Sequence, residues 1–307
     1  MRKPTVRQLQ VLERIARSMN FSQAGREMHL TQPTVSMQMR QLADTVGAPL
    51  FQHLGKRLFF TEAGEHVLAA ARQILDALDQ MDSRLAALGG LERGHLRLGV
   101  VTTAKFFAPR LMGKFQQLHP GIEASLTVAR RDELLRRLRE NLDDIYIFSI
   151  PPEGANLTVE PFLENELVVI AARQHPLAAR KAAIPPAALC AYPFLQREAG
   201  SGTRTMTDHF FAKHGLTPRI QMELGSNFAI QQVVATGIGI AIVSRTTIDG
   251  LGSGKDLALL NVKGFPLRGW WNLVYQTSKS ASPVVRQFAE FVHSQHSPGT
   301  GTPPRTR

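Results

Sequence analysis

The chain has 307 residues, enough for two or three domains that each bury a core of their own. Its net charge of +11 favours polyanionic partners, and residues 1–60 carry nine Lys and Arg against three acidic residues. Cys190 is the only cysteine, which excludes an intramolecular disulfide, and the longest apolar run, 233–243, is too short to span a membrane. Because the N-terminus also lacks the apolar stretch of a signal peptide, we expect a cytoplasmic protein.

The first 47 residues predict three helices. Apolar residues at three- and four-residue steps indicate a helix over 9–19, and a short second helix follows over 22–28 with Ser22 as its N-cap. A third helix opens at the TQP sequence of 31–33, where proline costs no hydrogen bond, and stops at Gly47. A short helix, a tight turn and a second helix form a helix-turn-helix, which fits the DNA major groove. Double-stranded DNA is therefore the expected partner.

A basic loop and a short strand follow the third helix. Residues 53–57 form the predicted loop, and 58–60 form the strand. Lys56 and Arg57 of this loop are expected to contact the DNA backbone or the minor groove, as a wing would. A basic surface that only aids solubility is the alternative, but the helix-turn-helix in the same segment favours DNA.

A long helix is predicted from residue 61 to residue 88, a stretch without proline. Its apolar residues alternate steps of four and three, as in the seam of a coiled coil. This pattern predicts a helix that pairs with a second copy of the chain, whereas an amphipathic helix packed on its own domain is the alternative. Glycines at 89, 90 and 94 then predict a hinge. The predicted dimerisation residues are Val67, Ala71, Ile74, Leu78, Met81, Leu85 and Leu88.

After the hinge, predicted strands alternate with predicted helices, which indicates an α/β domain with parallel sheets. The tail is rich in Pro, Gly and Thr and is expected to be disordered from 296 to 307. The expected strands are 96–101, 124–128, 145–148, 167–171, 220–224, 238–243 and 272–275, and the expected helices are 108–118, 132–140, 203–213, 228–236 and 283–293.

Several ordered phrases resemble one family. They are FSQAGREMHLTQPTVSMQMRQLADTVGAPLF from residue 21, FTEAG at 60–64, HPG at 119–121 and VATGIGIAIVS at 234–244. To about residue 294 the chain resembles the LysR-type transcriptional regulators. The phrases GLERGHLRLGV, FFAPRL, PPEG, REAGSGTR and ELGSNFAIQQVVATG resemble the subgroup that regulates Calvin-cycle (RuBisCO) operons, usually called CbbR. Regulators of other pathways, such as sulfur assimilation, are similar enough to remain an alternative.

The resemblance implies a fold class and an assembly. The N-terminal part would be an all-α winged helix-turn-helix plus a linker helix. The C-terminal part would be an α/β periplasmic-binding-protein-like domain of two subdomains, with the effector in the cleft between them. A homotetramer, built as a dimer of dimers, and RNA polymerase as a further partner are also implied. The boundaries would be 1–60 for the DNA-binding domain, 61–90 for the linker helix, 95–163 with 268–295 for subdomain I, and 164–267 for subdomain II, so that the effector-binding domain spans 95–295.

Candidate DNA contacts lie at the start of the third helix. Gln pairs with adenine, Ser with a base or a phosphate, and Pro and Thr methyl groups pack on thymine. LysR-type regulators often carry arginine after the serine, but this chain carries Met37, which favours apolar contact over direct reading of guanine. Arg40 is assigned to phosphate or to structure, and Val35, Met39 and Leu42 are assigned to the core. The predicted DNA-binding residues are Ser22, Gln32, Pro33, Thr34, Ser36, Met37, Gln38, Arg40, Lys56 and Arg57.

Candidate effector contacts lie where predicted strands end and helices begin. Free backbone N–H groups and hydroxyls at helix starts bind carboxylate or phosphate, and the guanidinium of Arg204 would add bidentate pairing. Well-capped helices without a ligand are the alternative. We expect a small anionic effector, either a phosphorylated metabolite or a nicotinamide nucleotide. The predicted effector-binding residues are Thr102, Thr103, Arg130, Ser149, Gly200, Ser201, Gly202, Thr203, Arg204, Ser226 and Asn227.

Two local features depart from the pattern expected of the subgroup. The strand 145–148 is bulky, and Phe228 replaces a charged residue, so both could narrow the cleft or change its ligand. The basic run at 130–140 is interpreted as a solvated helix face, with Arg130 alone kept as a cleft residue.

An enzyme on a Rossmann-like sheet is the alternative from a different class. The GIG at 237–239 is only a fragment of a dinucleotide fingerprint and precedes a strand, which is the wrong context. The ten histidines are scattered, and no serine lies in a nucleophile elbow. We therefore expect a protein that is not an enzyme and uses neither a cofactor nor a metal. A solute-binding protein is disfavoured because the helix-turn-helix is present and a signal peptide is not.

Overall fold

The computed structural model describes residues 3–55, 57–88, 93–249 and 256–296. These residues form two compact units, one of N-terminal helices and one built on a nine-stranded sheet. Lys56, the predicted hinge at 89–90 and the predicted tail from 297 onward lie outside the described residues. Among the described helices, none is both long and apolar enough to cross a membrane.

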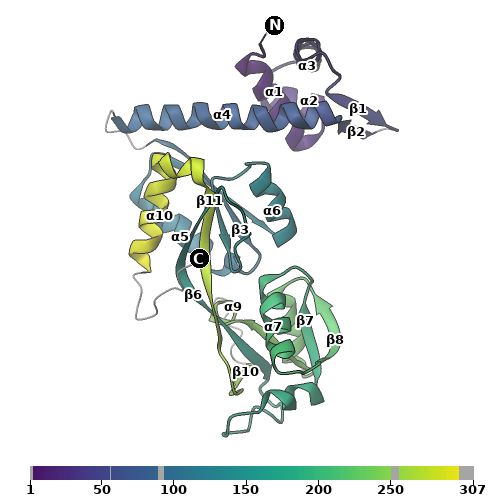
Figure 1. Cartoon of the computed structure of the whole chain (residues 1–307), viewed down its shortest axis with the longest axis vertical. Coiled ribbons are helices and arrows are strands. Elements are labelled where there is room, and N and C mark those ends of the chain that lie inside the picture. The colour runs from purple at the N-terminus through teal and green to yellow at the C-terminus, as the bar shows by residue number, and fades with distance from the viewer. Residues whose placement is uncertain (1–2, 56, 89–92, 250–255, 297–307) are drawn as a thin grey trace. The chain divides into compact units, whose positions relative to one another are not determined.

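The N-terminal unit contains α1 (Val6–Ser18), α2 (Phe21–Glu27), α3 (Gln32–Val46) and α4 (Glu62–Leu88) (Figure 1). The predicted limits of α3 are confirmed, because Thr31 caps its start and Gly47 ends it at a φ of 80°. The predicted N-cap of α2 is wrong. The side chain of Asn20 accepts the Gln23 N–H at 3.0 Å, so the helix starts earlier and Ser22 lies in its first turn.

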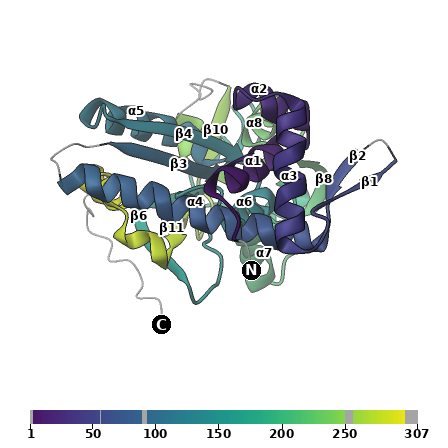
Figure 2. The same cartoon turned by 90° about the horizontal axis from the view of Figure 1, so that it is seen from above.

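The wing is a two-stranded hairpin, not the single strand and preceding loop that the sequence indicated. Antiparallel strands β1 (Phe51–Leu54) and β2 (Arg57–Phe60) pair along their whole length. The ring of Phe51 lies 4.8 Å from that of Phe60 and 5.2 Å from that of Phe21 in α2. Figure 2 shows the hairpin projecting beside α3. Aromatic packing therefore anchors the base of the wing on the helix-turn-helix.

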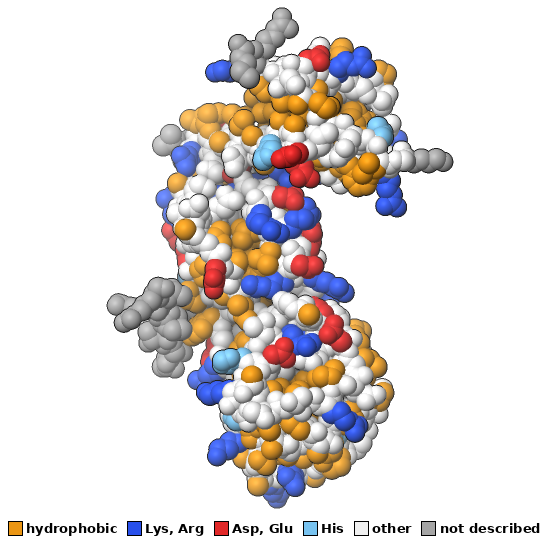
Figure 3. All heavy atoms as spheres, turned by 45° about the vertical axis from the view of Figure 1, so that its right-hand side comes forward, with side chains coloured by type: hydrophobic (Ala, Val, Ile, Leu, Met, Phe, Trp, Pro, Cys, Tyr) orange, Lys and Arg blue, Asp and Glu red, His pale blue; other side chains and the backbone are white. Residues whose placement is uncertain are grey.

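The predicted seam of α4 has two different environments in the single chain. Near the start of the helix, Ala71 is fully buried in the core of the N-terminal unit, together with its neighbour Leu68. Further along, Ile74, Met81 and Leu85 are 46–59% exposed. Hydrophobic side chains on the surface of this unit are visible at the top of Figure 3. The side chain of Leu88 lies outside the described part of the chain.

The second unit is built on one mixed sheet, in the strand order β4-β3-β5-β11-β6-β9-β7-β8, with β10 paired to β6. The pairs β3–β4, β3–β5, β7–β8 and β7–β9 are parallel, whereas β6 and β11 run antiparallel to each other and to their other partners. The bounds are β3 (Gly94–Val101), β4 (Ile122–Ala129), β5 (Ile145–Phe148), β6 (Leu157–Ala172), β7 (Pro193–Arg197), β8 (Arg219–Leu224), β9 (Ile240–Ser244), β10 (Leu257–Leu260) and β11 (Leu267–Gln276).

The expectation of parallel sheets is therefore wrong for the middle of the sheet. Two long strands cross there between a first half, β3 to β5, and a second half, β7 to β9. The sequence indicated only 167–171 and 272–275 of these two strands, because 157–166 holds charged residues and a proline. Such a stretch lacks the apolar run by which a buried strand is found.

Helices cover both faces of each half. On the first half, α5 (Ala108–Leu118) and α10 (Pro283–Gln295) form one core and α6 (Arg131–Arg139) another (Figure 1). On the second half, α7 (Gly202–Lys213) and α8 (Asn227–Ala235) lie in separate cores. The bulky residues of β5 are fully buried and divided between the two cores of the first half. Their bulk therefore fills the interior. The short elements η1 (Ala104–Phe106), η2 (Pro186–Ala191), α9 (Thr246–Asp249) and η4 (Thr277–Ala281) connect the others.

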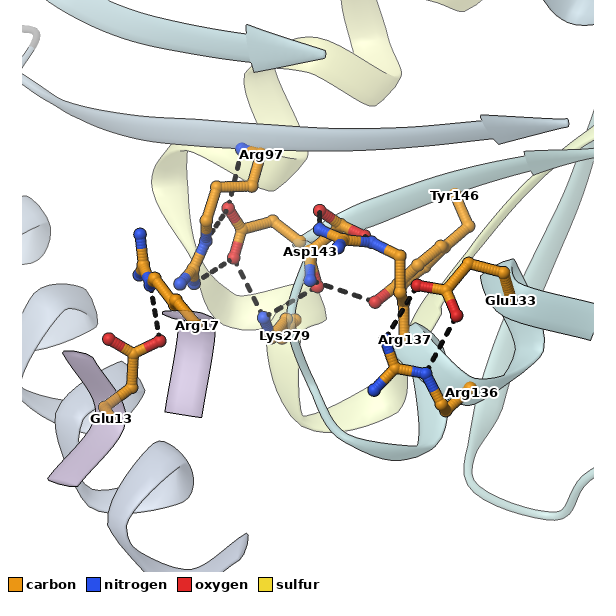
Figure 4. A network of polar contacts seen from close by, with 10 residues as sticks. Glu13, Arg17, Arg97, Glu133, Arg136, Arg137, Asp143, Tyr146 and Lys279 are labelled. Carbon is orange, nitrogen blue, oxygen red and sulfur yellow. Dashed lines mark hydrogen bonds and ion pairs between the residues drawn. The ribbon is translucent and has the colours of Figure 1, made fainter. Parts of the chain in front are cut away.

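A buried ionic cluster fixes the start of β5. The Asp144 carboxylate accepts two hydrogen bonds from the Arg97 guanidinium, at 3.1 and 2.8 Å, and one from Lys279 Nζ at 2.8 Å. Next to it, Asp143 forms a bidentate pair with Arg137 of α6 (Figure 4). Burial raises the pKa of Asp144, but the bonds from Arg97 and the charge of Lys279 outweigh it and lower the pKa to about 2.

Candidate functional site

The predicted base contacts lie at the start of α3, and the buried face of this helix holds them in place. Gln32, Pro33 and Met37 are exposed, whereas Val35 and Met39 are buried, as predicted for core positions. Leu42 is fully buried too. The side chain of Met37 is 50% exposed, so an apolar group stands on the outward face of the helix.

The polar side chains of this surface are already paired within the helix. Gln32 Nε2 donates to Ser36 Oγ at 2.9 Å, and the hydroxyls of Thr31 and Thr34 lie 2.8 Å apart. Gln38 is half-buried, while Arg40 and the wing residue Arg57 are exposed. The surface therefore combines polar groups near the helix start with cations beside them, as contact with bases and phosphates requires.

Three strand ends of the first half meet at one edge of the sheet. Thr102 and Thr103 follow β3 directly, Arg130 follows β4 and Ser149 follows β5. Because β3 pairs in parallel with both β4 and β5, their carboxyl ends lie at the same edge. In open α/β sheets, ligands bind outside such carboxyl ends.

The second half contributes helix starts and a strand end. Ser201 caps α7 by accepting the Arg204 N–H at 3.1 Å, and Gly200 precedes it at a φ of 83°. Ser226 is the half-buried N-cap residue of α8, and Asn227 is its first residue. Arg197 is the last residue of β7 and is only 3% exposed.

The two groups of residues contact each other. Arg197 donates from Nη1 to Thr103 Oγ1 at 3.2 Å and from Nη2 to Thr102 Oγ1 at 3.3 Å. Asn227 Nδ2 donates to Thr103 Oγ1 at 2.8 Å. Ser149 Oγ lies so close to Gly202 that a side chain there would force one of the two residues to shift. The structure thus brings the predicted residues of both halves together.

Of two further predicted residues, Arg130 contacts the opposite half and Thr203 does not. The Arg130 guanidinium lies against Gly225 at the end of β8, where an added Cβ would be 2.8 Å from Nη2. Thr203 is buried in α7, and its carbonyl accepts the hydroxyl of Thr207. Arg130 therefore reaches across to the second half, whereas Thr203 is held inside its own helix.

Arg204 is paired within its own half of the sheet, and an arginine that sequence reasoning missed, Arg197, contacts the opposite half instead. The Arg204 guanidinium contacts Asp208 at 2.7 Å, Glu223 at 3.2 Å and the Arg197 carbonyl at 3.0 Å. The guanidinium that contacts Thr102 and Thr103 of the first half is that of Arg197. A lone basic residue at the end of an apolar strand, just before the GSG turn, is the signal that could have identified it.

The site is rich in hydrogen-bond donors and poor in acids. The carboxylate of Glu198 alone forms a bidentate pair with Arg197, at 2.6 and 2.7 Å. Within the described residues, the buried Oδ1 of Asn227 has no hydrogen-bond partner. A buried guanidinium, two hydroxyls and a helix start provide the groups that bind a carboxylate or phosphate.

The basic run at 130–140 is only partly the solvated face that was expected. Arg131 Nη1 donates to the Ile150 carbonyl, and its guanidinium lies 5.3 Å from the centre of the Phe148 ring. Burial lowers the pKa of Arg131. Arg137 binds Asp143, as described above, whereas Arg136 forms an exposed pair with Glu133. Arg131 and Arg137 therefore serve the fold of the first half.

Comparison with known families assigns both units. Residues 6–65 match the family model of the bacterial regulatory helix-turn-helix protein, lysR family, and residues 89–297 match the LysR substrate binding domain. The chain belongs to the LysR family of transcriptional regulators. Its helix-turn-helix binds promoter DNA, and its sheet unit is the domain that binds a small effector.

Two characterised relatives match nearly the whole chain. The transcriptional activator CmpR of Synechocystis is 44% identical over 95% of this chain and 96% of its own length. A RuBisCO operon transcriptional regulator of Acidithiobacillus ferrooxidans is 44% identical over 98% of this chain and 97% of its own. A solved structure, the Synechocystis CcmR regulatory domain in complex with 2-PG, is 42% identical. It matches with a TM-score of 0.62 over 66% of this chain and 97% of that domain. These relatives are transcriptional regulators.

Proposed function

We propose that this LysR-type regulator controls genes of carbon dioxide fixation, in particular a RuBisCO operon, in response to a small anion. The relatives named above support the choice of genes, because their similarity extends over both the DNA-binding and the effector-binding unit. The anion is proposed to be 2-PG or a similar phosphorylated metabolite, since the CcmR regulatory domain was solved with 2-PG. We further propose that the protein is not an enzyme and acts in the cytoplasm, where promoter DNA lies.

The observation that carries the effector proposal is the position of Arg197. Its buried guanidinium contacts hydroxyls of the opposite half, at Thr102 and Thr103, and is neutralised by the single carboxylate of Glu198. An anion that reaches this point gains two charge-assisted hydrogen bonds in a site shielded from water. Ser149, Ser201, Gly202 and Asn227 are proposed to supply the remaining donors.

The DNA contacts are proposed from the exposed start of α3 and from the wing. Gln32, Pro33, Thr34, Ser36, Met37 and Gln38 would face base edges, while Ser22, Arg40, Lys56 and Arg57 would face phosphates. We propose domain limits of 1–60 for DNA binding, 61–90 for the linker and 95–295 for effector binding. In this arrangement, anion binding shifts the equilibrium between two positions of the halves and changes the spacing of DNA-binding pairs in a tetramer.

Calorimetric titration of the full chain with 2-PG tests the effector proposal. Replacing Arg197 by Met, which keeps the length of the side chain and removes its charge, should weaken binding roughly 10- to 100-fold, as expected for a lost bidentate charged pair. The matched control is Arg204→Met in α7, for which we expect a change below about threefold because that guanidinium is held by Asp208 and Glu223. If R204M abolished binding while R197M retained it, the role would belong to Arg204, as the sequence first indicated.

A further inference from the structure

A cavity lies along the later turns of α7, from Thr205 onward. The strand ends of the proposed effector site do not line it. Its volume is about 660 Å³, and it is bounded by α7 on one side and by residues 264–268, which include the start of β11, on the other. Thr205, His209 and Lys213 contribute to it at four-residue steps, so one face of the helix forms a wall. The volume falls within the roughly 300–1,000 Å³ that is usual for small-molecule sites. The residues assigned to effector binding do not line this cavity.

The floor of the cavity is apolar and partly aromatic. The ring of Phe210, which is 5% exposed, lies 4.7 Å from the ring of Phe265 and 4.5 Å from that of His214. Pro266 and Leu267 are half-buried at the entry to β11 and complete the lining with Met206. Gly264, at a φ of 90°, brings the backbone close to the Phe210 ring, since a Cβ there would lie 3.5 Å from it. A flat hydrophobic body would gain from burial on this floor.

The rim of the cavity is cationic. Lys213 and Arg268 lie at opposite walls, the former in the last turn of α7 and the latter in β11, and none of the described residues that line the cavity is acidic. Among the described residues Lys213 forms no ion pair, and Arg268 contacts Glu164 only through an exposed pair at 3.4 Å. His214 is bonded through Nδ1 to the Phe210 carbonyl at 2.8 Å, so the ring is held in place at the rim. An exposed ion pair of this kind contributes little, so both cations are available to an anion.

We propose that this cavity is a second ligand site, which binds a small amphiphilic anion with a hydrophobic body and one phosphate or carboxylate group. The apolar floor would give a free inorganic anion no gain, and the cationic rim would give a neutral hydrophobic molecule no charge partner. The two features therefore select a molecule that carries both groups. The occupant would contact the same helix whose first turn, at Ser201 and Gly202, belongs to the effector site.

Titration calorimetry with 1-naphthyl phosphate tests the proposal on the full chain carrying Arg197→Met, so that binding at the effector site is weakened. We expect one site per chain. Binding should weaken roughly 10-fold or more in Lys213→Met with Arg268→Gln, because the charge-assisted bonds to the phosphate are lost. A second variant, His209→Trp, should also block binding, since its indole fills the cavity. Lys181→Met, an exposed lysine of the same half that does not line the cavity, is the matched control and should leave binding unchanged.

Two ligand controls separate the floor from the rim. Inorganic phosphate and 1-naphthol should each bind at least about 10-fold more weakly than 1-naphthyl phosphate, since each lacks one of the two groups. The proposal is overturned if binding persists in both cavity variants, if either control ligand binds as well, or if binding disappears with Arg197→Met alone. That last outcome would place the probe in the effector site and would leave the proposed function unaffected.

Discussion

At the scale of single residues, the chain places its charges where strands begin and end. Arg197 lies at the carboxyl end of β7, among the groups proposed to bind the effector, whereas Asp143 and Asp144 lie directly before β5. Charged residues are therefore proposed to bind the ligand at one edge of the sheet, and they form the buried ionic cluster at the other. The bidentate pair of Arg197 with Glu198 belongs to the proposed anion site, so Glu198 stands where an effector carboxylate or phosphate would compete.

The Asp144 cluster predicts a specific loss of stability in acid. Because the pKa of Asp144 is lowered from its ordinary 3.8 to about 2 in the folded chain, its contribution is fully present above pH 4. This contribution, about 2 kcal/mol, should be lost as the pH falls from about 4 to 2. Urea unfolding of the full chain at a series of pH values measures the effect.

The variant Asp144→Asn should be less stable than the parent at pH 7 and should approach it in acid. Asp132→Asn, which removes an exposed carboxylate from the same half, is the control and should follow the parent throughout. Equal stability of D144N and the parent at neutral pH would show that the cluster contributes nothing to folding.

Prediction from the sequence succeeded for residues whose structural role depends on their immediate neighbours in the chain. Thr31 and Gly47 carry their own capping signals, so the limits of α3 could be predicted. The end of an apolar strand marks Arg197 as a candidate beside Arg204, but only the tertiary arrangement decides which of the two guanidinium groups faces the opposite half. Ser22 was chosen as a cap although Asn20, an equally good cap, comes two residues earlier.

At the scale of elements, the long helix α4 has two environments along its length. Its first turns pack on α1 through Leu68 and Ala71, while Ile74, Met81 and Leu85 remain exposed in the single chain. Exposed hydrophobic residues at coiled-coil spacing favour a second copy of the helix as their partner. We therefore retain the paired linker as a prediction and restrict it to the second part of the helix.

Substitution of the exposed seam should dissociate the oligomer without unfolding the N-terminal unit. Leu85→Asp, alone or with Ile74→Asp, places a charge in the expected contact and should lower the mass of the particle in light scattering. Ala69→Asp adds the same charge on another face of α4, where the residue is exposed, and should leave the mass unchanged. An unchanged mass for L85D would contradict pairing through this seam.

Element prediction worked best for segments with a clear period. The predicted limits of α5, 108–118, and of β5, 145–148, are confirmed, because each element stands between turn signals. The long strand β6 was found only in part, and β10 was missed. Long crossing strands carry polar residues on stretches that are stabilised by neighbours distant in sequence, so no local pattern reveals them.

At the scale of the whole molecule, the chain contains a DNA-reading unit and a sheet unit whose two halves contact each other through Arg197. Binding of an anion there is expected to favour one arrangement of the halves, and a ligand can shift an equilibrium only by its difference in affinity for the two states. If several cationic side chains of each subunit contact phosphates, DNA binding should also weaken steeply with salt.

DNase I footprinting of the target promoter, with and without 2-PG, tests the central claim most directly. At ligand concentrations that saturate the chain in calorimetry, the account predicts a shorter footprint and a smaller DNA bend, and Arg197→Met should abolish both changes. An identical footprint and bend angle with and without bound 2-PG would contradict it.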